Sequence, residues 1–452
     1  MKQRLITPFG LPIYVFAVTI LVGTVLLHLE ASWAQPGSIS WLSALFTATS
    51  ATCVTGLAVV PTNGFSALGQ TVILCLIQLG GLGIMTYTSL VFYLWRKRVS
   101  ITDRLAVGQS LLHDPSFNLG RFLVQIVVLC FSIEAAGAIL LFACDPRGFA
   151  PFSALFHAVS AFCNAGFSLF DASLMPWRSH VGVNGVIMGL IILGGLGFSV
   201  LIDMLRTMRS RLVSGSRSRK RLAWQTGIVI KTSLFLILAG WVVIFLAEWH
   251  GGFGSTDHLG TQVLSALFQS VTARTAGFNT VNIAGMTNIA LVIMLPLMLI
   301  GGSPGSCAGG IKTTTFRTTI AFAWAQLLGR RQVVINGYAL EEKSVNKALV
   351  LIILAVVTVL TATVILSVSE GRELAHLRVR GQIVEILFEV VSAFGTVGLS
   401  TGLTPHLTPI GKGVIIVLMF VGRLGPIAFL AFLQGWQTRE RFAWPERDML
   451  IG

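Results

Sequence analysis

Between Glu30 and Arg96 the sequence contains no Asp, Glu, Lys or Arg, an uncharged stretch of 65 residues. One membrane-spanning helix needs only about 20 residues, so this stretch is too long for a single span. Its first part, 40–65, is rich in Ser, Thr and Gly, whereas 66–95 is mainly aliphatic and aromatic. Polar backbone is tolerated at membrane depth only where protein or a water-filled cavity surrounds it. We therefore expect a short re-entrant helix, a non-helical return strand and then a spanning helix.

The composition of the whole chain agrees with a membrane protein. Of its 452 residues, 54% are hydrophobic and 11% are charged, whereas soluble proteins carry about 25% charged residues. This excludes a cytosolic enzyme, a disordered protein and a disulfide-rich secreted domain. The six cysteines form no CxxC pair, so we expect them to be small packing residues. Paired carboxylates, an HExxH motif and a Ser/Lys arrangement are also missing, and we expect neither an enzyme nor an organic cofactor.

The same sequence pattern occurs four times. Each unit has an apolar segment, a Leu-Phe dipeptide expected to begin a short helix, one glycine nine or ten residues later, and an apolar span with further glycines. The apolar segments are 11–28, 122–143, 232–247 and 348–368, the dipeptides are Leu45-Phe46, Leu155-Phe156, Leu267-Phe268 and Leu387-Phe388, and the glycines are Gly56, Gly166, Gly277 and Gly398. These glycines lie 110, 111 and 121 residues apart, so the repeats are domain-sized units.

We therefore predict an all-α polytopic membrane protein. Four span–pore-loop–span repeats surround a central pore, giving eight spanning helices and four re-entrant pore helices. The expected repeats are 1–104, 105–215, 216–330 and 331–452. For the glycine clusters 80–83 and 194–197 we favour close helix packing, with a continuous helix after Gly83 and Gly197. The third repeat differs, because Gly, Pro and Ser are too dense in 301–315 for a helix, which predicts an irregular intramembrane loop over 301–310.

The positive charges indicate the orientation. The chain carries a net charge of +14, and 24 of its 32 Lys and Arg residues lie in the segments after each second span, at the termini or at Arg121. The positive-inside rule places these segments and both termini in the cytoplasm. They hold 8 acidic residues, whereas the rest of the chain holds 8 basic and 10 acidic ones. The basic charge thus indicates anionic lipid and a cytosolic regulator as partners, and no nucleic acid.

One glycine per loop indicates an ion filter. A ring of backbone carbonyls can replace the hydration shell of an ion, and glycine accepts the backbone angles that aim successive carbonyls at one axis. Neutral oxygens, together with the negative ends of the short helices, favour a cation. The expected filter residues are Val54, Thr55, Gly56, Asn164, Ala165, Gly166, Thr275, Ala276, Gly277, Thr396, Val397 and Gly398.

These four units, with their glycines 56, 166, 277 and 398, resemble the Trk/Ktr/HKT superfamily of potassium transporters over essentially the whole chain. Without an additional N-terminal helix pair, the chain is most similar to the KtrB-type membrane subunits of bacterial Ktr systems. The resemblance implies K⁺ uptake, often assisted by Na⁺, in the bacterial inner membrane. It also implies a homodimer with one pore per subunit and a cytosolic ring of nucleotide-binding RCK subunits of the KtrA type. In plant HKT proteins, serine at the first-loop glycine goes with Na⁺ preference, so the intact Gly56 points to K⁺.

The resemblance also implies a gate below the filter. The irregular loop in the third repeat stands where the family has an intramembrane gate. Arg423 is a single charge deep in the last span, which is costly unless it has a partner or a water-lined cavity. In the family an arginine at this place faces the pore and contacts the gate. The expected gate residues are Gly301, Gly302, Ser303, Pro304, Gly305, Ser306, Gly309, Gly310, Lys312 and Arg423.

Several other charged residues have weaker predictions. Arg274 is expected to hold loop carbonyls or an acidic neighbour, and Glu134 to support the same loop or to lie at a helix-packing seam. Glu385 and Glu389 are interpreted as acidic residues near a helix N-terminus without a further role. Two alternative functions stay open, a Na⁺-permeable or K⁺/Na⁺ transporter of the same superfamily and a secondary transporter of a small solute. The second usually has two inverted repeats rather than four parallel ones.

Overall fold

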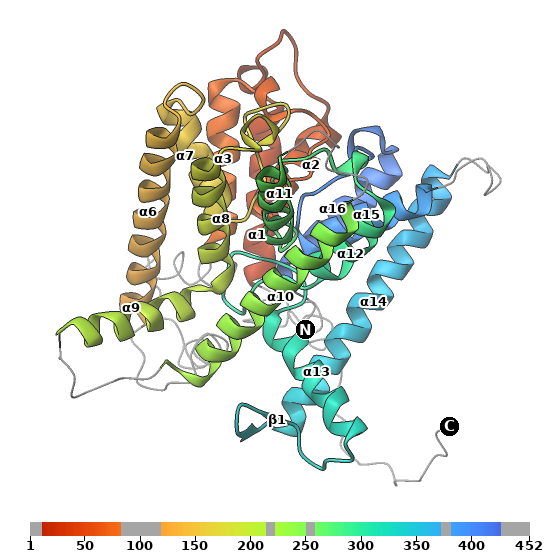
Figure 1. The fold of residues 1–452 in the computed structure, drawn as a ribbon. Helices are drawn as coiled ribbons and strands as arrows, with labels where there is room; N and C mark the ends of the chain where they lie inside the picture. Colours follow the sequence, from red (N-terminus) through yellow and green to blue (C-terminus); the bar gives the residue numbers. More distant parts are fainter. Residues whose placement is uncertain (1–10, 83–118, 214–221, 250–257, 372–380, 426–452) are drawn as a thin grey trace, which may run out of the picture.

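The computed structural model describes residues 11–82, 119–213, 222–249, 258–371 and 381–425, which are mostly helical (Figure 1). The predictions about Gly83, the basic segments 96–104 and 439–447, and both chain termini lie outside these residues. Four long helices, one from each expected repeat, match the predicted first spans, which are therefore confirmed as helices. They are α1 (Leu11–His28), α6 (Leu119–Cys144), α10 (Trp224–Glu248) and α14 (Glu342–Glu370).

The long helices expose large apolar side chains to their surroundings. Ile139 on α6, Phe235 on α10 and Val364 on α14 are 64–68% exposed. Helices that are apolar on their outer face belong in lipid rather than in water. By length and composition, Leu123–Cys144, α10 and α14 can each cross a membrane alone.

Each long helix is followed by a short one that packs inside the molecule. The short helices are α2 (Trp41–Thr52), α7 (Pro151–Phe162), α11 (Leu259–Thr272) and α15 (Gln382–Gly395). With 12 or 14 residues each, they are about 18–21 Å long, too short for a hydrocarbon layer of about 30 Å. The Leu-Phe dipeptides lie inside these helices and not at their starts, so that expectation is wrong. The phenylalanine of each dipeptide is instead a fully buried packing residue.

The last apolar helices are α3 (Ala67–Gly81), α8 (Val181–Leu196), α12 (Asn288–Leu299) and α16 (Pro409–Leu424). The expected continuous helix after Gly197 is wrong, because α8 and α9 (Phe198–Val213) meet at an angle of 103°. Gly197 has a φ of +90°, which ends a right-handed helix at little cost for glycine alone. The two helices α8 and α9 are long and apolar enough to cross a membrane only when they are taken together. The count of eight spans stays a prediction.

Gly80 and Gly194, one from each of the two glycine clusters, serve close helix packing as predicted, and Gly422 on α16 does the same. A methyl group at Gly80, Gly194 or Gly422 would overlap the carbonyl oxygen of Thr52, Phe162 or Phe394, respectively. Each of these carbonyls belongs to the last turn of a short helix. Small residues in the last span of a repeat therefore let that span approach the end of the short helix from the same repeat.

Two small elements complete the fold. After the irregular loop, α13 (Thr313–Leu327) leads to a hairpin that the all-α prediction did not include, β1 (Val334–Ile335) and β2 (Tyr338–Ala339). Its turn is Asn336-Gly337, with φ values of +50° and +85°, which is typical of a two-residue hairpin turn. Single 3₁₀ turns occur at Glu30–Ser32, Thr62–Gly64, Met175–Trp177, Ile283–Gly285 and Thr404–His406.

Candidate ion filter and gate

The four loops that follow the short helices share one backbone conformation. Each filter glycine has a positive φ, between +70° and +92°, and so does the residue two positions earlier. Side chains with a Cβ avoid this region at a cost of about 1–2 kcal/mol each, so four such residues are held there by their surroundings. These four residues are Val54, Asn164, Thr275 and Thr396, with φ values of +57°, +58°, +71° and +51°.

The four glycines form a closed ring. A Cβ placed on Gly166 would lie 2.8 Å from the carbonyl oxygen of Ala276, and one on Gly277 would lie 2.5 Å from that of Val397. Added Cβ atoms on Gly56 and Gly398 would overlap the carbonyl oxygens of Ala165 and Thr55. Each glycine therefore abuts the carbonyl that precedes the glycine of the next loop, and the fourth loop returns to the first. The structure thus brings all twelve expected filter residues into one ring of loops.

Hydroxyl groups near the ends of the short helices hold the loops. The Ser50 and Ser392 hydroxyl oxygens each accept a hydrogen bond from the amide of their filter glycine, Gly56 and Gly398, at 3.1 Å. In the other two loops the hydroxyl donates instead, from Ser160 to the Phe167 carbonyl at 2.8 Å and from Thr272 to the Phe278 carbonyl at 2.6 Å.

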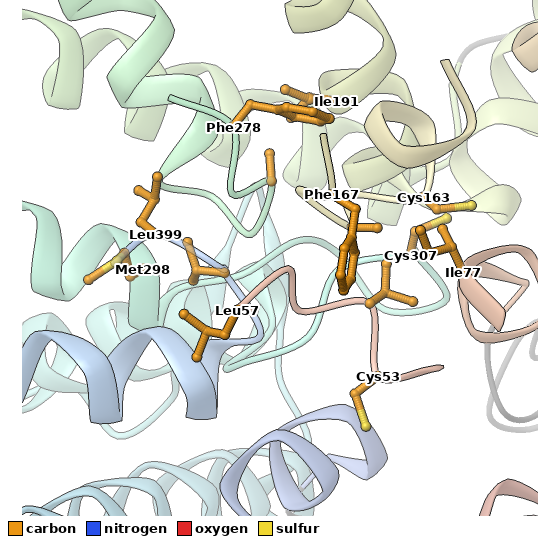
Figure 2. Close-up of a cluster of buried hydrophobic side chains, with 14 of the residues drawn as sticks. Cys53, Leu57, Ile77, Cys163, Phe167, Ile191, Phe278, Met298, Cys307 and Leu399 are labelled. Atoms are coloured by element: carbon orange, nitrogen blue, oxygen red, sulfur yellow. The ribbon is translucent and has the colours of Figure 1, made fainter. Parts of the chain in front are cut away.

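Apolar side chains anchor each loop on its other side. The residue after each filter glycine is buried, with at most 2% of its surface exposed, and Figure 2 shows these four side chains in the apolar cluster around the loops. They are Leu57, Phe167, Phe278 and Leu399. The filter is therefore fixed by hydrogen bonds from the short helices and by packing of the following residue.

Neutral oxygens adjoin the ring. The short helices end at Thr52, Phe162, Thr272 and Gly395, directly before the four loops, so the partial negative charge of each helix C-terminus adjoins the ring. The hydroxyl oxygens of Thr55, Thr275 and Thr396 are buried and have no hydrogen-bond partner among the described residues. Unpaired buried oxygens are costly unless water or an ion contacts them.

A cavity of about 330 Å³ lies against the ring, lined by all four filter glycines and by the loops that follow them. Asp171 lines it, and its carboxylate accepts a hydrogen bond from the Asn63 side chain. Asp145, which follows α6, holds a second carboxylate. It accepts a hydrogen bond from the Trp177 indole at 2.8 Å, and this indole packs against Phe170 in the cavity wall. Hydrogen bonds from the Trp177 indole and from the Gly148 amide lower the pKa of Asp145, which keeps this carboxylate negatively charged.

Sequence reasoning missed the environment of Glu389. Its side chain is fully buried and accepts hydrogen bonds from Ser400, Thr401 and Thr404, including 2.7 Å from the Thr404 hydroxyl. It therefore holds the loop after the fourth filter strand and is no helix-end charge, so that interpretation is wrong. The equivalent position in the second repeat is His157, whose Nε2 lies 3.0 Å from the Ser168 hydroxyl. In both repeats, the residue nine positions before the filter glycine contacts the residue two positions after it. This shared spacing is the sequence signal that could have indicated the contact.

The loop between α12 and α13 is irregular, as predicted, and most of it is buried. It docks on the bend between α8 and α9. The amides of Ser303 and Cys307 donate to the carbonyls of Gly195 and Gly194 at 3.0 and 3.2 Å, and the Ser303 hydroxyl donates to the Leu196 carbonyl. In return the Phe198 amide donates to the Gly305 carbonyl at 3.0 Å. The sequence did not indicate this contact.

The same loop touches the filter. A Cβ on Gly309 would overlap the side chain of Thr396, and one on Gly301 would lie 3.3 Å from that of Thr275. Both threonines are filter residues two positions before a ring glycine. Of the expected gate residues, Gly301, Gly302, Ser303, Ser306, Gly309 and Gly310 are buried, whereas Pro304 and Gly305 are half-buried.

Three cations, the buried Arg274 and Arg423 and the half-buried Lys312, hold the loop through its carbonyls. Arg423, 8% exposed, donates to the carbonyls of Cys307 and Gly80. Lys312 donates from Nζ to the Ala308 carbonyl at 2.6 Å. Arg274 donates to the Gly301 carbonyl at 3.2 Å and to both oxygens of Ser233. Of the two predicted kinds of partner for Arg274, loop carbonyls or an acidic neighbour, the structure shows one loop carbonyl, that of Gly301.

Glu134 does not support the loop near Arg274, because its partners among the described residues belong to the first and second repeats. One of its carboxylate oxygens, Oε1, accepts from the Gln78 side chain at 3.1 Å and from the Cys163 thiol at 3.7 Å, while the other, Oε2, has no partner among the described residues. The carboxylate thus lies where α3, α6 and the end of α7 meet. The alternative prediction, a helix-packing seam, describes its position.

Comparisons with known proteins agree with this architecture. Residues 13–434 match the TrkH family, described as cation transport proteins. The chain is 38% identical to Ktr system potassium uptake protein B of Bacillus subtilis, over 97% of this chain and 95% of that protein. It is 33% identical to potassium/sodium uptake protein NtpJ of Enterococcus hirae, over 100% and 99%. The crystal structure of the potassium transporter TrkH from Vibrio parahaemolyticus superimposes with a TM-score of 0.71 at 19% identity, covering 96% of this chain and 87% of that one.

Proposed function

Since the chain belongs to the TrkH family of cation transport proteins, we propose that it is the ion-translocating subunit of a potassium uptake system. K⁺ passes through the ring of four loops, and the irregular loop between α12 and α13, the gate loop (residues 301–310), controls its passage. The observation that carries this proposal is the closed ring in which each filter glycine abuts the carbonyl of the next loop.

The ring suits a dehydrated monovalent cation. Carbonyl oxygens converge from four sides, so they can replace water molecules around an ion. The filter strands carry no charged side chain, so an ion is bound by dipoles alone and can leave again. Four intact glycines, among them Gly56, support K⁺ rather than Na⁺ as the ion that fits this ring.

The surroundings of the ring provide an entrance and a closed exit. The cavity of about 330 Å³, with Asp171 in its wall, supports a hydrated cation waiting before the filter. On the other side the gate loop lies against Thr275 and Thr396. Arg423 holds this loop and adds a positive charge to the path. The loop must therefore move before an ion leaves the filter.

The remaining parts of the proposal concern direction and partners. The chain works as a homodimer in the bacterial inner membrane, with both termini in the cytoplasm and with anionic lipid around its basic segments. A cytosolic RCK subunit of the KtrA type binds nucleotide and moves the gate. The B. subtilis relative is named as a component of a Ktr system, which supports a regulatory partner for this chain.

A second candidate function is a K⁺/Na⁺ transporter, in which Na⁺ assists K⁺ or is itself carried. The name of the E. hirae relative, potassium/sodium uptake protein, favours it. The two functions differ in one ratio, the flux of Na⁺ relative to that of K⁺ in the same membranes. A secondary transporter of a small solute has less support, because all four repeats contribute one strand to a single ring.

Rescue and flux measurements test the proposal. The chain, expressed in a strain that lacks its own potassium uptake, is expected to restore growth at low external K⁺. In proteoliposomes it is expected to carry rubidium, a substitute for K⁺, faster than sodium. Comparable Na⁺ flux would favour the second candidate. No flux of any monovalent cation, for protein that is correctly folded and inserted, would refute both.

A further inference from the structure

Two thiols from different repeats meet beside the filter. Cys163 follows the last residue of α7, and Cys307 lies in the gate loop. Each is 1% exposed, and the two thiols are close enough to interact with each other. Figure 2 shows them side by side, although 144 positions separate them in the sequence. The gate loop therefore carries a thiol that contacts the short helix of the second repeat.

An acidic group adjoins this pair. The Glu134 carboxylate lies 3.7 Å from the Cys163 thiol through Oε1, and Oε2 is buried without a partner among the described residues. Cys130 stands one helical turn before Glu134 on α6 and therefore on the same face. The thiol pair thus lies next to a carboxylate that can take up a thiol proton.

The two cysteines differ in what their backbones are attached to. Cys163 is held within its repeat, since its amide donates to the Val159 carbonyl at 2.9 Å. Among the described residues, Cys307 is held by other elements, through its amide to Gly194 at 3.2 Å and through its carbonyl to Arg423. These two contacts must change when the gate loop moves. A covalent bond between the thiols would tie the moving loop to a fixed helix.

From this geometry we propose that Cys163 and Cys307 form a disulfide when the protein meets a hydroperoxide, and that this bond locks the gate loop in its closed position. The lock rests on the proposed function, since it requires that the gate loop control ion passage. The formation of the bond itself requires only that movement of the loop lets peroxide reach Cys307.

The chemistry balances with peroxide as the oxidant. Movement of the loop exposes Cys307 to water that contains the peroxide. Its sulfur bonds to one peroxide oxygen as the O–O bond breaks, and the leaving hydroxide takes the thiol proton, which gives a sulfenic acid and one water. Cys163 then gives its proton to Glu134, and its sulfur attacks the sulfenic sulfur. The S–S bond forms, hydroxide leaves, and it takes the proton from Glu134 as a second water. Two thiols lose two electrons in total, and the peroxide is reduced to two waters.

The chain contains a matched control. Cys53 lies three residues before Gly56, as Cys163 lies three residues before Gly166, and it is equally buried at the end of α2. In Figure 2 its side chain stands apart from Cys307. The two cysteines thus share their place in the repeat but not their contact with the gate loop.

The first experiment identifies the bond. The full chain in lipid is treated with hydrogen peroxide, free thiols are blocked, and peptides are analysed by mass spectrometry without reduction. We expect a peptide pair linking Cys163 to Cys307 in the wild type and in Cys53→Ser, and its loss in Cys163→Ser and Cys307→Ser. A wild-type protein that contains no such linked pair after oxidation overturns the proposal.

The second experiment measures the lock. Rubidium flux into proteoliposomes is expected to fall in proportion to the disulfide-linked fraction, to recover with dithiothreitol, and to be insensitive to peroxide in Cys163→Ser and Cys307→Ser. Each variant is compared with itself before oxidation, so a change in its basal flux does not matter. Full linkage without loss of flux would overturn the lock. Linkage in a protein that carries no cation at all would instead refute the proposed function and leave the bond in place.

Discussion

Substitution of Gly56 by serine is the sharpest test of the ring. Gly56 has a φ of +92°, and an L-residue in the left-handed region costs about 1–2 kcal/mol. A Cβ there would also overlap the Ala165 carbonyl oxygen and lie 3.1 Å from the Gly166 Cα. These neighbours are backbone atoms of the next filter strand and cannot rotate away as a side chain can. The first and second loops must therefore separate, which widens the ring on one side.

A wider ring no longer fits K⁺, the ion proposed to bind in the ring of four glycines. We expect Gly56→Ser to lower the ratio of rubidium flux to sodium flux at least about tenfold, equivalent to about 1.4 kcal/mol of lost discrimination. Both fluxes are measured in proteoliposomes at equal protein content, with sodium as the competing ion. The ratio is informative even if the variant is less stable, because both ions report on the same folded molecules.

Gly37 provides the control for backbone strain. It has a φ of +102° and no atom within 4 Å of an added Cβ, and it lies on the surface between α1 and α2. Gly37→Ser therefore carries the same conformational cost without any contact to the ring. We expect its flux ratio to equal that of the wild type. An unchanged ratio in Gly56→Ser, or an equal fall in both variants, would refute the assignment of this loop to the filter.

Three further predictions concern the gate. Deletion of residues 303–309 is expected to raise rubidium flux, and a fall or no change would count against a gating role. Arg423→Gln removes the two hydrogen bonds to the carbonyls of Cys307 and Gly80. Each is worth about 1.5–3 kcal/mol for a charged group, so unregulated flux should rise about tenfold or more. Lys412→Gln in the first turn of α16 should not change the flux. Gly197→Ala places a methyl group 2.6 Å from the Ser303 hydroxyl at a φ of +90°, which should loosen the gate loop and change the flux. Gly185→Ala within α8, where an added methyl group has no atom within 4 Å, should leave flux unchanged. Equal fluxes in these two variants would contradict the docking of the gate loop on the α8–α9 bend.

Local patterns allowed much of the architecture to be predicted from sequence. The four first spans are long apolar runs that contain a single charged residue, Glu134, and α1 ends at His28, where the pattern predicts. The filter loops were also predictable, because glycine at a fixed distance after a short apolar helix recurs four times. The density of Gly, Pro and Ser in 301–310 predicted the irregular loop from backbone propensities alone.

Other features depend on contacts between repeats and left no clear local signal. Gly197 stands in a glycine cluster that also fits straight helix packing, so the bend between α8 and α9 follows only from its docking with the gate loop. Glu389 lies near the middle of a short helix, where its sequence neighbours do not indicate a partner, and its loop partners become apparent only when repeats are superimposed. The contact between Cys163 and Cys307 joins two repeats through a loop without regular structure, which no periodicity reveals.

Location of the bound ion tests the central claim most directly. Crystals of the full chain, grown with rubidium in place of potassium and without sodium, can be measured by anomalous diffraction at the rubidium edge. The account predicts anomalous density on the axis enclosed by Gly56, Gly166, Gly277 and Gly398, next to the carbonyls of Thr55, Ala165, Ala276 and Val397. A ring without rubidium in crystals that bind the ion at another place within the membrane region would contradict it.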